Sequence, residues 1–296
     1  MELQWPLILF TLFISWSAGL YAALNLHALA KGSKTARMPA LASSAVLLAI
    51  GGVAVFFHLE HWDRIFNGFG HLSSGITQEL IAVVAIALCM VATLAALRRT
   101  GGDIPAALAV LNVAAALALV LVTGHSYMMS ARPTWENPAQ MLSLLGNACV
   151  LGPASYTVID GLAKRGEEHR KPDSRASAAI IIGSIANAAT TCAFIASMAA
   201  SSSSFTQIDR FFDGILATKP LATVESYSPF FGDALGMTVA AISLSVAAAA
   251  LAVASRRKSQ ARLPVLAMLV VACGAMGSVA LRMAMYATGG SVFMYY

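Results

Sequence analysis

The sequence predicts an all-α integral membrane protein with eight transmembrane helices in one bundle, and two observations carry that prediction. Hydrophobic residues make up 58% of the 296 residues and charged residues only 11%, with a mean hydropathy of +0.73. A soluble domain carries about 25% charged residues. The apolar residues also gather into runs of about 20, which is the length that a helix needs to cross the hydrocarbon core of a bilayer.

The apolar runs divide the chain into eight expected spans. The first, residues 5–30, has no basic segment before it and is too long for the apolar core of a signal peptide, so we interpret it as an uncleaved helix. Seven further runs lie at about 39–58, 76–97, 104–127, 139–162, 177–200, 231–254 and 264–287. We expect residues 1–296 to form a single membrane-anchor domain.

The distribution of Lys and Arg indicates how the spans are oriented. Of the 19 basic residues, 14 lie in the loops after the first, third, fifth and seventh spans. Basic loops stay in the cytoplasm, so both termini are predicted on the non-cytoplasmic side of the cell inner (cytoplasmic) membrane. The net charge of +5 is therefore a topology signal, and we expect contact with the lipid bilayer and no binding to nucleic acid.

The cysteines give no sign of a cofactor site. Cys89, Cys149, Cys192 and Cys273 each stand alone in an apolar run, with no second ligand nearby. We interpret them as small buried hydrophobic residues. We expect no haem and no metal in this chain.

Two ionisable residues stand out at the predicted outer face. His58 ends the second span and Glu79 lies about one turn into the third, so they should reach one depth on antiparallel neighbours. An ionisable group within a span is costly and suggests a functional site. A quinol gives up two protons as two electrons leave, and this pair offers two proton acceptors. The alternative for His58 is an interfacial histidine satisfied by backbone or water.

Other polar residues fall at the same level. They are Arg64 and Asn67 in the loop after His58, His125 and Tyr127 at the end of the fourth span, and Arg282 and Tyr286 in the eighth. Arg282 is the only basic residue well inside an apolar run, and it needs an anionic or carbonyl partner. Glu79, Asp233 or a quinone carbonyl would serve, and a structural ion pair is the simpler alternative.

Motifs along the whole chain resemble, in order, the membrane-anchor subunit of dimethyl sulfoxide reductase and, more remotely, the polysulfide and nitrite reductase anchors. They are WPLILFTLF, HLEHWDRIFNGF followed by TQEL, PTW followed by a span ending LGP, and LRMAMYAT. The histidine and arginine of the family's H-L-G-S-P-x-R-A-F motif correspond to His58 and Arg64, although a longer Glu-His-Trp-Asp replaces Gly-Ser-Pro. The glutamate of S-N-E-I corresponds to Glu79, and R-G-x-x-F-Y to residues 282–286.

The resemblance implies a subunit that oxidises menaquinol at an outer-face site. Its electrons would pass to a four-cluster, ferredoxin-like iron-sulfur subunit and on to a molybdopterin catalytic subunit that reduces an acceptor such as dimethyl sulfoxide. Both partners are expected on the outer face. The expected catalytic residues are His58 and Glu79. The expected quinol-binding residues are His58, Glu79, Arg64, Asn67, His125, Tyr127, Arg282 and Tyr286.

Two other functions stay open from the sequence. One is a haem b-type quinol-oxidising anchor, in which His58 and His125 would supply an axial pair near the outer face. The other is a solute transporter, in which Arg282 and Glu79 would bind the solute. A transporter is expected to hold its charges at the midplane, in helices broken by Gly or Pro, whereas the polar residues here cluster near one face.

Overall fold

The computed structural model describes residues 3–58, 71–164, 174–202, 227–256 and 262–291. Within these residues every regular element is helical, and eight helices are long and apolar enough to cross a membrane. This confirms the predicted fold class. The helices are α1 (Trp5–Leu29), α2 (Arg37–Phe56), α3 (Gly75–Arg99), α4 (Ala106–Ser126), α5 (Ala139–Ala163), α6 (Ser174–Ser201), α9 (Gly232–Ser255) and α10 (Leu263–Ala287).

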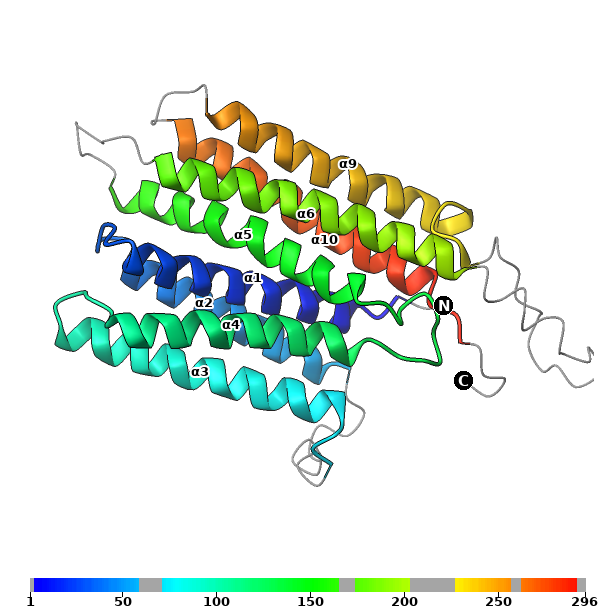
Figure 1. Ribbon diagram of the computed structural model, residues 1–296, viewed down its shortest axis with the longest axis horizontal. Helices are drawn as coiled ribbons and strands as arrows, with labels where there is room; N and C mark the ends of the chain where they lie inside the picture. Colours follow the sequence, from blue (N-terminus) through cyan, green and yellow to red (C-terminus); the bar gives the residue numbers. More distant parts are fainter. Residues whose placement is uncertain (1–2, 59–70, 165–173, 203–226, 257–261, 292–296) are drawn as a thin grey trace, which may run out of the picture.

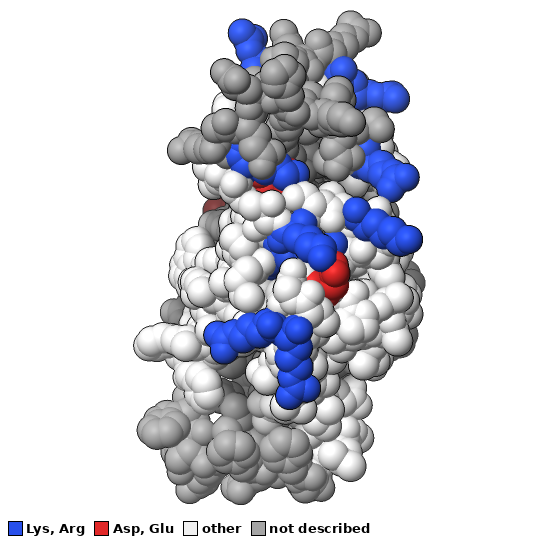
Figure 2. Space-filling view, turned by 90° about the vertical axis from the view of Figure 1, so that its left-hand side faces the viewer, with Lys and Arg blue, Asp and Glu red and all other residues white. Residues whose placement is uncertain are grey.

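The helices lie side by side, so the molecule has two ends (Figure 1). The start of α1 and the end of α10 lie at one end, and the α1–α2 and α3–α4 connections lie at the other. Figure 2 looks onto the latter, which we call the basic end, and shows Lys and Arg side chains spread across it. Its described basic residues are Lys31, Lys34, Arg37, Arg98, Arg99, Lys164, Arg175, Arg256 and Arg262. At the opposite end, Arg132 is the only Lys or Arg in a connection between helices among the described residues, and Arg282 lies within α10.

The eight helices form two groups of four with the same internal arrangement. In the first group α1 packs on α2 and α4, and α3 packs on both α2 and α4. In the second group α5 packs on α6 and α10, and α9 packs on both of those. The groups meet where α1 contacts α5, with α4 also on α5 and α10 also on α1. The pattern of helix contacts therefore repeats between the two groups, a repeat that we did not detect in the sequence.

The central contact between α1 and α5 depends on small residues. A Cβ added to Gly19 of α1 would lie 2.2 Å from the carbonyl oxygen of Ala148, and one added to Gly152 would lie 2.3 Å from that of Gly19. Neither position has room for a side chain. Such close backbone approach is how helices gain packing contacts in a membrane, where lipid is as apolar as the side chains.

Two carboxylates at the basic end, Asp103 and Asp160, form ion pairs with nearby basic residues. The Arg37 side chain is 3% exposed and donates to the carbonyl oxygens of Gly102 (2.8 Å) and Gly32 (2.9 Å) and to Asp103 Oδ1 (3.1 Å). These bonds join the α1–α2 and α3–α4 connections. At the end of α5, Lys164 Nζ lies 2.7 Å from the Asp160 carboxylate.

The cysteines differ from the prediction. All four are free thiols, with Cys192 exposed and the other three half-buried. The expectation of fully buried residues was wrong, because a helix surface that faces lipid accepts a small apolar side chain as readily as a protein core does.

Candidate functional site

Glu79 is a buried carboxylate near the end opposite the basic end. It lies one turn into α3, as predicted, and only 8% of its surface is exposed. The Ser126 hydroxyl, at the last residue of α4, donates a hydrogen bond to its carboxylate. The two helices meet closely here, since a Cβ on Gly75 would lie 2.9 Å from the Ser126 Cβ. The start of α3 and the end of α4 thus hold Glu79 in place.

His58 lies at the same end of the bundle but in a different environment. It follows the last residue of α2, Phe56, by two positions, and its side chain is exposed. No hydrogen bond or ion pair joins His58 to Glu79, so their pairing stays a prediction. Arg64 and Asn67 lie outside the described residues.

Arg282 is the most deeply buried charge in the described part of the chain, with 1% of its surface exposed. Its Nη1 donates to Gln140 Oε1 (2.6 Å) and its Nη2 to Ser143 Oγ (2.5 Å), both on α5. Neither Glu79 nor Asp233 lies within ion-pair distance of it. The alternative of a structural ion pair with either residue is therefore not seen, because the packing of α10 on α5 gives the guanidinium two neutral oxygen partners instead.

Aromatic residues connect the Glu79 and Arg282 regions. Tyr127 follows the end of α4, is 6% exposed, and interacts electrostatically with Glu79, Arg282 and Tyr286. Tyr286 packs edge to face against Trp135 at a ring-centroid distance of 5.2 Å. The Trp135 indole also donates to the Met285 carbonyl oxygen (2.8 Å), which ties the α4–α5 connection to α10. Residues from both helix groups therefore share one buried polar cluster.

Several polar atoms in this cluster have no hydrogen-bond partner among the described residues. They are the Nε of Arg282, the side-chain nitrogen of Gln140 and the hydroxyl of Thr123. All three side chains are 1% exposed or less. Buried polar groups in native proteins are nearly always bonded to protein, water or ligand. Groups of this kind beside a carboxylate and a guanidinium suit a polar ligand.

Of the remaining predicted residues, His125 lies in the last turn of α4 with an exposed side chain. The sequence analysis missed Ser126, Trp135, Gln140 and Ser143. The sequence did hold a signal for Gln140 and Ser143. Together with Asn147 they recur at helical spacing, which places polar groups on one face of an apolar span. The described residues contain no group of three or more His, Cys, Asp or Glu side chains that would hold a metal ion.

The fold and the buried cluster define a multi-span membrane protein with a polar site near one end of its bundle. The family model for the DMSO reductase anchor subunit (DmsC) matches residues 1–286, and the chain belongs to that family. Membership makes it the membrane anchor of an oxidoreductase complex that also has catalytic and electron-transfer subunits. The same comparisons found no match among curated proteins or solved structures.

Proposed function

We propose that this chain oxidises menaquinol at the end of the bundle opposite the basic end. The two electrons pass to an iron-sulfur partner subunit, and from there to a molybdopterin subunit that reduces an acceptor such as dimethyl sulfoxide. The positive-inside rule supports a cytoplasmic basic end, an inner-membrane location, and both partner subunits on the outer face.

The observation that carries the proposal is a buried carboxyl group and a buried guanidinium that do not bind each other. Glu79 and Arg282 both interact with Tyr127, yet Glu79 accepts from Ser126 while Arg282 donates to Gln140 and Ser143. Burying a charge without a counter-charge costs several kcal/mol in proteins, because the ion loses its hydration. A quinol has one oxygen on each side of its ring, which suits a base on one side and a donor on the other.

Quinol oxidation breaks two O–H bonds and removes two electrons, leaving a quinone. In the proposed site the Glu79 carboxylate accepts one proton, and the exposed His58 imidazole accepts the other and releases it to water. Arg282 donates to a ring oxygen as negative charge develops on it. Tyr127 and Tyr286 line the ring, and His125, Arg64 and Asn67 complete the quinol-binding set proposed from the sequence.

The test compares two electron donors in the purified complex. Glu79→Gln removes the base and is expected to lower turnover with a menaquinol analogue by about 100-fold, the lower range for loss of a positioned base. Turnover with a soluble dye that reduces the partner subunits directly should stay unchanged. Glu136→Gln is the matched control, because Glu136 is an exposed carboxylate at the same end. Unchanged quinol turnover in Glu79→Gln would falsify the proposal.

His58→Gln gives a second, smaller test. The imidazole is exposed, so water partly replaces it as proton acceptor, and we expect a loss of only about tenfold. The loss should be confined to the quinol donor. An equal loss with the dye would mean that the substitution disturbs assembly, and a full rate with quinol would remove His58 from the mechanism.

A further inference from the structure

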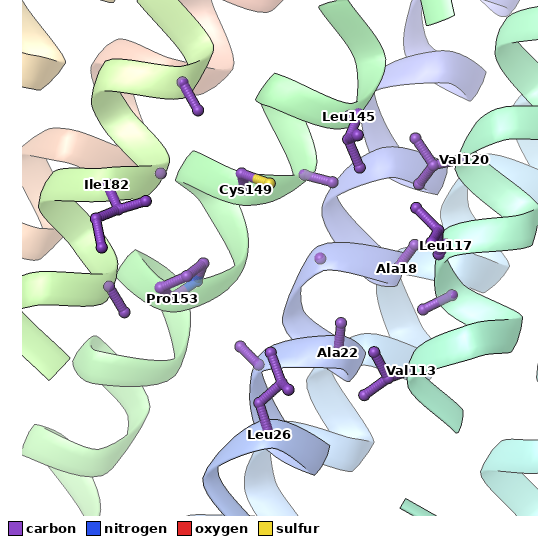
Figure 3. A pocket seen from close by; sticks show the side chains of 17 residues that line it. Ala18, Ala22, Leu26, Val113, Leu117, Val120, Leu145, Cys149, Pro153 and Ile182 are labelled. Atoms are coloured by element: carbon purple, nitrogen blue, oxygen red, sulfur yellow. The ribbon is translucent and has the colours of Figure 1, made fainter. Parts of the chain in front are cut away.

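An apolar groove opens at the seam between the two helix groups. It is open on one side, encloses about 360 Å³ and is lined by α1, α4, α5 and α6. Figure 3 shows Ala22 of α1 and Cys149 and Pro153 of α5 between Ile182 of α6 on one side and Leu117 of α4 on the other. The lining carries no charged or hydrogen-bonding side chain apart from the Cys149 thiol.

Small residues create this hollow. A Cβ added to Gly183 of α6 would lie 1.9 Å from the Cys149 carbonyl oxygen, so α6 presses on α5 as closely as α1 does. The three helices form a tight floor, and residues such as Ala22 and Ala186 leave the space in front of it unfilled. The rim residues Leu117 and Ile182 are 44% and 69% exposed, so the groove opens toward the surrounding lipid.

Measured along the helix axes, the groove begins close to the level of the buried polar cluster and extends from there toward the basic end. The lining residue farthest from the basic end is Val120 on α4, one turn before Thr123, and Leu145 on α5, two residues after Ser143. At 1.5 Å per residue, these separations are about 3 to 5 Å along the helix axes. From Leu145 to Pro153 the groove then runs about 12 Å toward the basic end.

We propose that this groove binds the isoprenoid tail of the quinol whose ring occupies the polar cluster, an inference that rests on the proposed function. A quinol with its ring near the outer face must lay its tail inward across the midplane, and the groove lies along that path. It is apolar throughout, as a prenyl chain requires. The tail leaves the ring site between α4 and α6, which also gives the quinol a lateral route from the bilayer.

A second groove on the other side of α1 and α5 serves as an internal comparison. It has a volume of about 450 Å³ and is lined by α1, α2, α5 and α10, the helices that correspond to those of the first groove in the repeated contact pattern. On α5 its lining starts at Ser155, twelve residues after Ser143 and about 18 Å deeper. On α5, the helix that carries Gln140 and Ser143, the second groove therefore starts farther from the polar cluster than the first, and we assign the tail to the first.

The experiment measures turnover of the complex with a long-tailed menaquinol and with a water-soluble naphthoquinol that has no tail. Ala186→Phe fills the groove and is expected to raise KM for the long-tailed quinol by about fivefold, a modest effect because lipid and groove are both apolar. KM for the tail-less quinol should not change. Ala189→Phe is the matched control, since Ala189 is exposed on α6 outside the groove. Ala42→Phe is a second control, because it fills the second groove, to which the tail is not assigned.

The outcomes separate the groove from the ring site. If the unmodified complex oxidises neither quinol, the proposed function fails. If both quinols are oxidised and Ala186→Phe changes both KM values equally or neither, the groove assignment is overturned. Loss of a co-purified phospholipid from Ala186→Phe, with both KM values unchanged, would overturn it in favour of an acyl chain. Leu117→Trp, at the exposed rim, repeats the test if Ala186→Phe does not assemble.

Discussion

Two buried arginines, one near each end of the bundle, show how differently this protein treats the same side chain. Arg37 at the basic end binds two carbonyl oxygens and the Asp103 carboxylate. Among the described residues, Arg282 near the other end binds an amide oxygen, a hydroxyl and a methionine sulfur, and its guanidinium lies 5.7 Å from the centroid of the Phe194 ring. The first arrangement includes a carboxylate counter-charge and joins two connections, although the Arg37 Nε, like that of Arg282, has no hydrogen-bond partner among the described residues. The second leaves a positive charge uncompensated in the interior, which is expected where a ligand supplies the missing acceptor.

The largest expected effect tests this difference directly. Arg282→Met should lower quinol-dependent turnover by about 100-fold, or about 2.7 kcal/mol in the activation free energy. Its thermal stability should change little, because replacing a buried charge with an apolar residue of similar size is often neutral. Steady-state kinetics and thermal unfolding of the purified complex measure both. A large loss of stability with normal turnover would mean that Arg282 is structural.

Arg37→Met is expected to lower stability and leave turnover unchanged. It removes the three hydrogen bonds that the buried Arg37 guanidinium donates and should cost about 2 kcal/mol of stability, with turnover per assembled complex unchanged. The same unfolding and kinetic measurements apply. If Arg37→Met lowered quinol turnover in intact complex, the separation of roles between the two ends would be wrong.

Gln140→Glu is expected to give Arg282 a carboxylate partner, as Arg37 has in Asp103. The new carboxylate would bind the guanidinium, raise thermal stability and compete with the quinol, so turnover should fall about tenfold. Asn137→Asp is the control, because it adds a charge just before the start of α5, three residues from Gln140, and an aspartate keeps the bond that Asn137 accepts from the Ala139 N–H. Higher turnover in Gln140→Glu would show that Arg282 does not act on the ligand.

The sequence was sufficient for the features that depend on one helix at a time. Hydropathy located all eight spans, the basic loops fell together at one end, and Glu79 lies one turn into its helix. The partners of Arg282 depend instead on how α10 packs against α5, and 142 residues separate Arg282 from Gln140. Because both partners are neutral, no charge pattern marked them. The internal repeat was missed for a related reason, since small apolar residues fill corresponding positions without a distinctive motif.

The smallest expected effect concerns pH at the basic end. The hydrogen bond from Lys34, with the nearby Arg37, holds the pKa of the Asp103 carboxyl below its usual value. A carboxylate with a lowered pKa in the folded state stabilises the fold at neutral pH, and that contribution is lost as the pH falls through the lowered pKa. Thermal unfolding between about pH 6 and about pH 3 should therefore decline less steeply in Asp103→Asn than in the unmodified complex. Asp233→Asn, an exposed carboxylate at the opposite end, should keep the original slope. Identical slopes in all three proteins would show that the Lys34–Asp103–Arg37 contacts contribute nothing measurable.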